Sequence, residues 1–122
     1  EYLSGNRERF FVTAIDGIVV GCVEQKIVDA QTVELGALAI STRFRNQRVG
    51  VYTVNAFIHT MVAEGYRCFI SLTRNPRLQD LFRRLGFVET SRSEYRQRQS
   101  ESPGVTMFFK EAQAAESPPP KF

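Results

Sequence analysis

Apolar and polar residues alternate over the first third of the chain, and this pattern predicts three consecutive β-strands. Asp16-Gly17 predicts a hairpin turn after the first strand, and the polar run Asp29-Ala30-Gln31 predicts the turn after the second. Gly36 lies within the third strand, and a glycine in mid-strand often marks a β-bulge. We therefore expect an antiparallel meander, with strands over residues 9–15, 18–27 and 32–40.

The middle of the chain changes to helical spacing after a polar, arginine-rich loop over residues 42–48. Gly65 predicts the C-terminal end of this helix, because glycine is common just beyond the last helical turn. A strand over residues 66–72 follows. The helix itself is predicted because five apolar residues recur at helical spacing on one face: Val51, Val54, Ile58, Met61 and Val62.

A second helix is predicted to begin at Asn75-Pro76, because asparagine is a good N-cap and proline fits the first helical position. Gly86 predicts its end. Its apolar stripe consists of Leu78, Leu81, Phe82 and Leu85. The remaining pattern predicts a short strand over 87–90, a polar arm over 91–104, a last strand over 105–110 and a proline-rich tail.

This order of elements predicts one domain over residues 1–110, followed by a tail over residues 111–122. The fold class is α/β (α+β): a mixed, mostly antiparallel sheet flanked by helices. The net charge of +3 permits an anionic ligand and does not demand nucleic acid. No apolar run is long enough to span a bilayer. The two cysteines are expected to be reduced and buried in a cytoplasmic protein, with a disulfide as the alternative.

Three segments of the chain resemble motifs of the GNAT acetyltransferase superfamily. Residues 33–41 are similar to the family's fourth strand, and residues 44–50 are similar to its pyrophosphate loop, Arg/Gln-x-x-Gly-x-Gly/Ala. Residues 75–87 are similar to the Asn-x-x-Ala-x-x-Leu-Tyr-x-x-x-Gly-Phe segment. The resemblance implies a V-shaped opening between the fourth and fifth family strands. It also implies acetyl-CoA as co-substrate, with no metal.

The resemblance implies that loop amides at the start of the first helix bind the coenzyme's pyrophosphate, and a helix N-terminus is suited to an anion. The backbone of Leu38 and Ile40 is implicated in binding the pantetheine arm. Asn75 is either a cofactor contact or a plain helix cap. The candidate residues at the pyrophosphate loop are Arg45, Gln47, Arg48, Val49, Gly50, Val51 and Tyr52.

Two positions depart from the family pattern. Arg48 replaces the first glycine of the pyrophosphate loop, although its amide remains a donor. Phe82 replaces the tyrosine that serves as general acid in the family, and a phenyl ring has no proton to give. Either water or another residue protonates the thiolate, with Tyr95 in the polar arm as a candidate, or the protein is not an efficient acetyltransferase.

Glu34 is the candidate general base. An amine with a pKa near 10 is mostly protonated at neutral pH, so a base must remove its proton, directly or through water. Some family members place a glutamate on the fourth strand for this purpose, and Glu34 lies on the matching segment. The alternative is a solvated or salt-bridged strand glutamate.

The acceptor is not identified beyond a primary amine of a small molecule or a protein. Only residues 1–6 precede the first strand, and they resemble the tail of the family's second helix, so the acceptor side is expected to be incomplete in this sequence, or completed by another chain. Amino-acid acetyltransferases of the glutamate type are loosely similar. A homodimer, a non-catalytic CoA-binding or protein-interaction domain, and a basic nucleic-acid-binding module remain open, the last supported by the arginines alone.

Overall fold

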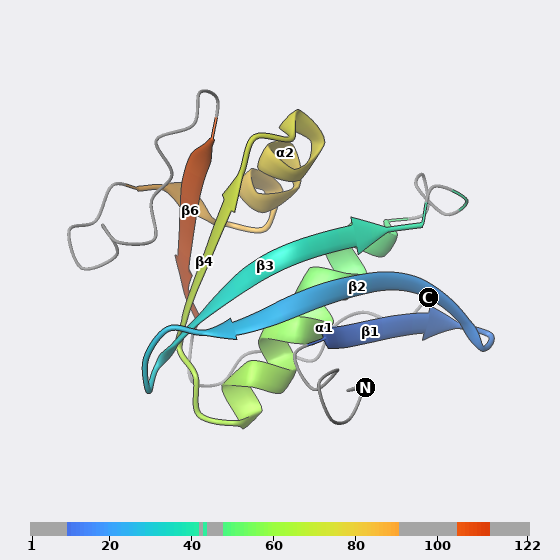
Figure 1. The fold of residues 1–122 in the computed structure, drawn as a ribbon, viewed down its shortest axis with the longest axis horizontal. Helices are drawn as coiled ribbons and strands as arrows, with labels where there is room; N and C mark the ends of the chain where they lie inside the picture. Colours follow the sequence, from blue (N-terminus) through green and yellow to red (C-terminus); the bar gives the residue numbers. More distant parts are fainter. Residues whose placement is uncertain (1–9, 42, 44–47, 91–104, 113–122) are drawn as a thin grey trace.

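The computed structural model describes residues 10–41, 43, 48–90 and 105–112 of the chain. They form one mixed sheet in the strand order β1-β2-β3-β4-β6-β5, and two helices cross over between strands (Figure 1). Both the sheet and its flanking helices agree with the predicted fold class. The elements are β1 (Phe10–Ile15), β2 (Ile18–Ile27), β3 (Thr32–Ile40), α1 (Val49–Ala63), β4 (Cys68–Thr73), α2 (Pro76–Arg84), β5 (Val88–Glu89) and β6 (Thr106–Glu111).

The parallel pair β3–β4 separates partway along its length. Pairing covers Thr32 with Cys68, Val33 with Phe69 and Glu34 with Ile70, and then it stops. Both strands continue beyond this point, β3 on β2 and β4 on β6. Figure 1 shows the two strands together at one end and diverging toward the other. The V-shaped opening expected from the sequence is therefore present.

A β-bulge interrupts β3 at the predicted glycine. Val23 of β2 pairs with Leu38 and Gln25 pairs with Leu35, so Gly36 and Ala37 together lie opposite a single residue. A Cβ at Gly36 would lie 2.8 Å from Glu24 Oε1 and 2.8 Å from Lys26 Cε, which leaves little room for a larger residue. Because a bulge bends its strand and increases the local twist, this one helps to turn the end of β3 away from β4.

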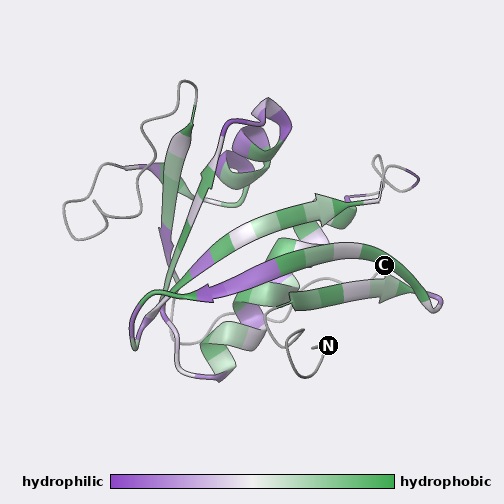
Figure 2. Cartoon of the chain, viewed as in Figure 1, coloured by the Kyte–Doolittle hydropathy of each residue, from purple (hydrophilic) through white to green (hydrophobic). Residues whose placement is uncertain are grey.

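Both helices pack on one face of the sheet, and aromatic rings fill the space beneath them. The ring of Phe57 on α1 lies 5.7 Å from Phe11 and 6.4 Å from Phe69, both in edge-on geometry. Figure 2 shows hydrophobic residues along the strands and α1, whereas α2 is mixed. The core therefore includes Phe57, which lies outside the apolar stripe predicted for α1.

The first helix starts earlier than the sequence pattern predicted. Its first residue is Val49, not Val51, because Val49 is fully buried and Arg48 before it adopts a left-handed conformation that redirects the chain. Thr53 is also fully buried, whereas Val62 is only partly buried. The predicted stripe was wrong in these details because α1 is apolar on more than one side.

The predicted ends of both helices are confirmed, and each has the hydrogen bonds of a Schellman motif. At the end of α1, Gly65 has φ of +104° and Tyr66 N–H donates to Met61 O over 3.0 Å. At the end of α2, Gly86 has φ of +88° and Phe87 N–H donates to Phe82 O over 2.9 Å. Only glycine adopts such values of φ without strain.

Small differences from the prediction occur at the strand ends. Strand β4 starts at Cys68 because Tyr66 and Arg67 complete the turn after α1, where Arg67 Nη1 donates to Tyr66 O over 2.9 Å. Strand β6 runs through Glu111, and Ala112 is buried with its N–H donating to Arg67 O over 2.8 Å. The ordered core thus extends into the segment predicted as tail. The two cysteines, Cys22 and Cys68, are free and half-buried.

Candidate functional site

A cleft of about 710 Å³ lies where the end of β3, the first turn of α1 and α2 converge. It opens on the side where β3 has left β4, so the separation of the two strands creates the space. Half of its lining residues were predicted as cofactor contacts, and the other half belong to α2 and its C-cap, Leu85. The lining consists of Leu38, Ile40, Arg48, Gly50, Val51, Asn75, Arg77, Leu78, Asp80, Leu81, Arg84 and Leu85.

The start of α1 forms one wall. Arg48 is its N-cap, with φ of 60° and ψ of 24°, and within the described part of the chain no side chain makes a capping hydrogen bond there. The first N–H groups of a helix have no partner within the helix, and they carry the positive end of its dipole. Tyr52 N–H donates to Arg48 O over 3.1 Å, so the amides of Val49, Gly50 and Val51 are the ones that precede the first hydrogen bond of the helix.

Gly50 allows α1 to lie directly against α2. A Cβ at this position would lie 3.2 Å from Leu81 Cδ2 and 3.9 Å from Ile40 Cγ1. A longer side chain would displace one of these neighbours or occupy the cleft. The glycine therefore sets the distance between the first turn of α1 and the opposite wall.

The end of β3 forms the floor, and it has an unpaired backbone edge. Ser41 N–H donates to Val20 O on β2 over 2.8 Å. Because backbone groups alternate sides along a strand, the N–H and C=O groups of Ile40 and Leu38 point away from β2, into the opening left by β4. This edge offers backbone donors and acceptors to an extended ligand.

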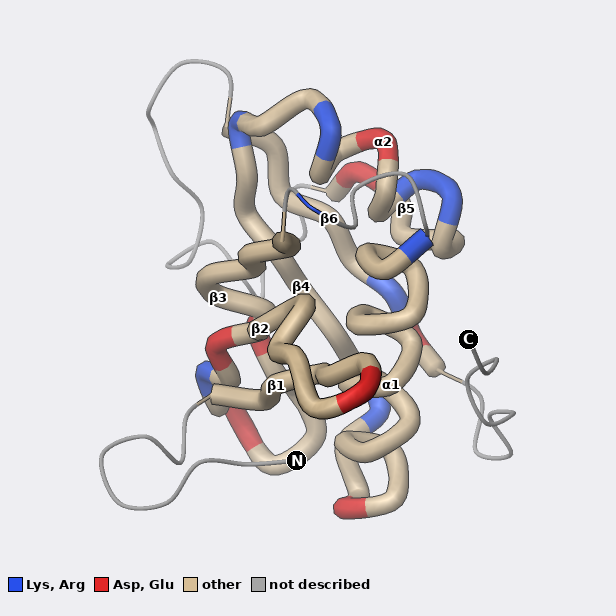
Figure 3. The backbone as a smooth tube through the Cα atoms, turned by 90° about the vertical axis from the view of Figure 1, so that its right-hand side faces the viewer, with Lys and Arg blue, Asp and Glu red and all other residues tan. Residues whose placement is uncertain are grey.

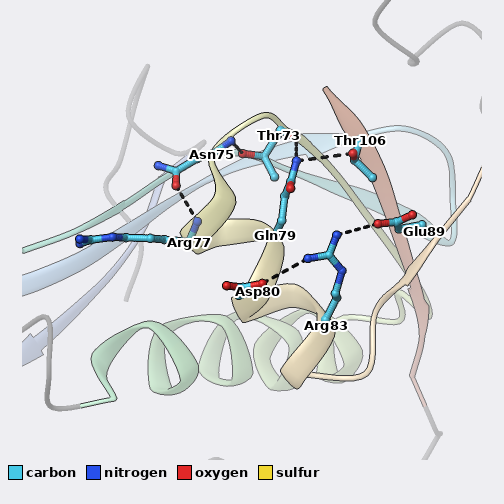
Figure 4. Close-up of polar contacts among 8 residues, drawn as sticks. All are labelled: Thr73, Asn75, Arg77, Gln79, Asp80, Arg83, Glu89 and Thr106. Carbon is cyan, nitrogen blue, oxygen red and sulfur yellow. Dashed lines mark hydrogen bonds and ion pairs between the residues drawn. The ribbon is translucent and has the colours of Figure 1, made fainter. Parts of the chain in front are cut away.

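The α2 wall is anchored by polar contacts at its first turn. Asn75 Oδ1 accepts from Arg77 N–H over 2.9 Å, so the N-cap role predicted for Asn75 is present. Gln79 Nε2 donates to Thr73 O over 3.0 Å and to Thr106 Oγ1 over 3.5 Å, which ties α2 to β4 and β6 (Figure 4). The cap uses only the oxygen of the Asn75 amide, which leaves the two N–H donors of its nitrogen for the cleft.

The charge of the lining is mainly positive, with Arg48, Arg77 and Arg84 against Asp80. The carboxylate of Asp80 is bound to Arg83 at 3.2 Å, and Arg83 also contacts Glu89 at 2.7 Å. Figure 3 shows Lys and Arg positions on and around α2. This excess of positive charge in the cleft lining favours the binding of an anionic ligand.

Glu34 does not line the cleft. Its neighbours on β3, Val33 and Leu35, point into the core under the helices, so Glu34 points to the other face of the sheet, beside Ile70. It is 8% exposed and is the last residue of β3 that pairs with β4. Ser71 Oγ donates to Leu35 O over 3.1 Å at the same level. The carboxylate therefore lies where the V begins.

Phe82 lies in the core rather than in the cleft. It is fully buried, with its ring 4.9 Å from Phe87 and 5.7 Å from Phe108. The three leucines of the same predicted stripe, Leu78, Leu81 and Leu85, are partly buried and also line the cleft. Because α2 lies at the edge of the opening, its apolar stripe contributes both to the core and to the lining of the cleft. Sequence periodicity alone cannot distinguish these two roles.

Several predicted site residues do not appear in the lining. Arg45, Gln47 and Tyr95 lie outside the described residues. Val49 is buried in the core, and Tyr52 is half-buried on α1, beyond the cleft. The sequence reasoning in turn missed Arg77, Asp80 and Arg84. Their spacing of three and four residues along one helix face was the only available signal.

Within the described ranges, no set of three or more His, Cys, Asp or Glu side chains is placed to hold a metal ion. The described helices are also too short or too polar to cross a bilayer.

Solved structures with the same fold include several acetyltransferases. A GNAT family acetyltransferase from Elizabethkingia anophelis, with acetyl-CoA bound, has a TM-score of 0.68 at 17% identity, covering 84% of this chain and 75% of that one. Ard1 from Thermoplasma volcanium has a TM-score of 0.69 at 19% identity, covering 87% and 72%. N-acetylglutamate synthase from Neisseria gonorrhoeae, complexed with coenzyme A and N-acetyl-glutamate, has a TM-score of 0.68 at 20% identity, covering 85% of this chain and 26% of that one.

Among curated proteins, none gives a significant match to this sequence. The sequence profile described as the Acetyltransferase (GNAT) family matches residues 1–87, which is more than half of the chain. The matched region contains the separating strands and the walls of the cleft described above. By sequence and by fold, this chain belongs to the GNAT acetyltransferase family.

Proposed function

We propose that this chain binds acetyl-CoA in the cleft and transfers the acetyl group to a primary amine of a small molecule or a protein. The observation that carries the proposal is the position of the uncapped start of α1. It opens into a cleft with three arginines in its lining, beside an unpaired strand edge. Structural neighbours with this fold hold acetyl-CoA or coenzyme A.

The residues of the cleft fit the chemistry of coenzyme A. Its pyrophosphate matches the amides of Val49, Gly50 and Val51 and the guanidinium of Arg48. Its pantetheine arm contains amide groups, which match the free backbone edge at Leu38 and Ile40. Asn75 adds side-chain N–H donors from the opposite wall. The pyrophosphate and the amide groups of the ligand therefore each have complementary groups in the cleft.

Acetyl-CoA supplies an activated acyl group when it is bound, and the protein must supply a neutral amine. In our proposal, Glu34 accepts the proton of the ammonium, directly or through water. This role is supported by the pairing of Glu34 with Ile70 at the start of the V, close to where we propose that the strand edge directs the thioester. Because Glu34 lies on the face opposite the helices, we propose that the acceptor approaches from that face.

Calorimetric titration with acetyl-CoA, together with a thiol-release assay over a panel of amines, tests this proposal. We expect saturable binding and amine-dependent release of coenzyme A. Glu34→Gln should lower kcat/KM by about a hundredfold or more while leaving acetyl-CoA affinity unchanged, since general-base catalysis contributes on the order of 10²–10⁴. The absence of any binding at millimolar acetyl-CoA would reject the proposal.

A second candidate is a GNAT domain that binds CoA or a partner protein without turnover. The observation that favours it is Phe82, which is fully buried and cannot protonate a departing thiolate. This alternative predicts acetyl-CoA binding without thiol release for every amine. It further predicts that Phe82→Tyr gives no activity, because the hydroxyl would be buried between Phe87 and Phe108 and away from the cleft.

A further inference from the structure

Arg77 lies at a position of α2 where a positive charge is unfavourable. It lies in the first turn of α2, where the positive end of the helix dipole repels cations, and this turn contains no acidic residue. Arg84, by contrast, lies in the last turn, where a cation is favourable. The location of Arg84 thus has a structural explanation, whereas that of Arg77 does not.

The guanidinium of Arg77 is also not engaged by any acidic side chain among the residues that the structure describes. Another arginine of α2, Arg83, is held by Asp80 and Glu89. Figure 4 shows the Arg77 side chain extending away from α2, and only its backbone N–H is joined to another drawn residue. Since Arg77 lines the cleft, its charge is available to a ligand there.

The cleft thus has two centres of positive charge on different walls. One is the start of α1 with Arg48, and the other is the start of α2 with Arg77. The two walls touch at Gly50 and Leu81. Arg77 precedes Leu81 by four residues, which is about 6 Å along the helix axis. A ligand that matches both centres carries two separate anionic groups.

Coenzyme A has two such groups, the pyrophosphate and the 3′-phosphate on the same ribose. If the start of α1 takes the pyrophosphate, as in the proposed function on which this inference rests, the second centre suits the 3′-phosphate. We propose that Arg77 recognises the 3′-phosphate, so that the protein discriminates coenzyme A from dephospho-coenzyme A. A guanidinium binds a phosphate through paired, charge-assisted hydrogen bonds, which are stronger than neutral ones.

Calorimetric titration of the whole chain with coenzyme A and with dephospho-coenzyme A tests this proposal. We expect the unaltered protein to bind coenzyme A about tenfold more tightly, which is the effect of one charge-assisted contact. Arg77→Gln should remove this preference by weakening coenzyme A alone. Its Tm should not fall and should rise slightly, because the side chain is exposed and the substitution removes a positive charge from the start of α2.

Two matched variants control for the loss of one positive charge. Arg84→Gln alters the same cleft, and Arg74→Gln alters an exposed arginine outside the lining. Both should retain the preference for coenzyme A.

Three outcomes would overturn the proposal. Equal affinity of the unaltered protein for the two ligands would show that the 3′-phosphate is not recognised, while the proposed function would stand. An equal loss for both ligands in Arg77→Gln would assign Arg77 to another part of the coenzyme. The absence of binding to either ligand would reject this inference and the proposed function together.

Discussion

The two helices that begin at the cleft do so with different chemistry. The N-cap of α1 is Arg48 in a left-handed conformation, without a side-chain cap. The N-cap of α2 is Asn75 in an extended conformation, with its side chain bonded to Arg77 N–H and with Pro76 in the first helical position. Among the residues that the structure describes, the start of α1 therefore has no side-chain acceptor for its backbone donors, whereas the start of α2 has one.

This difference separates two sources of helix stability. The start of α2 is specified locally, because the cap and the proline favour it before any tertiary contact forms. The start of α1 depends on the burial of Val49 and on the contact of Gly50 with Leu81. A helix start that is held by packing, without a side-chain cap, can donate its N–H groups to an anion. A side-chain cap already accepts from one of these N–H groups, so fewer remain for a ligand.

The largest effect is expected from breaking the packing that holds the start of α1. Gly50→Leu should lower coenzyme A affinity by roughly tenfold to a hundredfold, since overpacking of this kind typically costs about 1–3 kcal/mol. Calorimetric titration measures the affinity, and circular dichroism checks the fold. Gly50→Ala is the control, and it should bind nearly normally because the flexible end of Leu81 can yield. Normal binding by the leucine variant would contradict the assigned wall.

The next effect separates the two roles of Asn75. Asn75→Asp keeps an oxygen to accept from Arg77 N–H, but it removes the amide donors and adds a negative charge. We expect unchanged stability and roughly tenfold weaker binding of coenzyme A. Asn75→Ala loses the cap and should lower the free energy of unfolding by about 1 kcal/mol. If the aspartate variant binds coenzyme A normally, Asn75 is a cap only.

A smaller effect is expected at Arg48, where one substitution should raise the stability of the protein but weaken its binding of coenzyme A. Arg48→Gly should raise the free energy of unfolding by about 0.5–1 kcal/mol, because glycine adopts the left-handed conformation without strain. The loss of the guanidinium should weaken coenzyme A binding about threefold. Denaturant unfolding and titration measure the two quantities. Arg48→Ala, which keeps the strained backbone, should weaken binding equally without the gain in stability.

The smallest effect is expected at the other end of α2. Arg83→Gln removes the exposed ion pairs with Asp80 and Glu89, and such pairs contribute little to stability. We expect a small decrease in Tm at low salt that disappears at high salt, because screening already weakens the pairs there. Coenzyme A affinity should be unchanged. A large loss of affinity would show that this network positions the cleft wall.

Local chemistry predicted the helix ends and the bulge. Gly65 and Gly86 end their helices with positive φ, and Gly36 lies in the bulge of β3. Each of these positions is governed by the conformational range of a single residue, so a sequence pattern is sufficient to identify it. The start of α1 was predicted two residues late because no local signal marks Arg48 as left-handed.

The candidate site was predicted at the floor, at the α1 wall and at the N-cap of α2, but not along the rest of α2. The motif segments pointed to Leu38, Ile40, Arg48, Gly50, Val51 and Asn75, and all of these line the cleft. The apolar stripe of α2 was not predicted as part of the site, because such a stripe shows that one face of a helix is buried but does not show which element buries it. Leu81 meets Gly50 on the other helix, a contact between residues far apart in the sequence.

The sequence by itself determined the order of the elements, the ends of the helices and the kind of chemistry at the first loop, since these depend on residues close together in the chain. Only the tertiary structure decided where β3 leaves β4, which side chains meet across the opening, and that Phe82 is buried while Arg77 lines the cleft. The physical reason is that a cleft is bounded by separate elements. Its shape and charge depend on how those elements pack, and many distant contacts set that packing together.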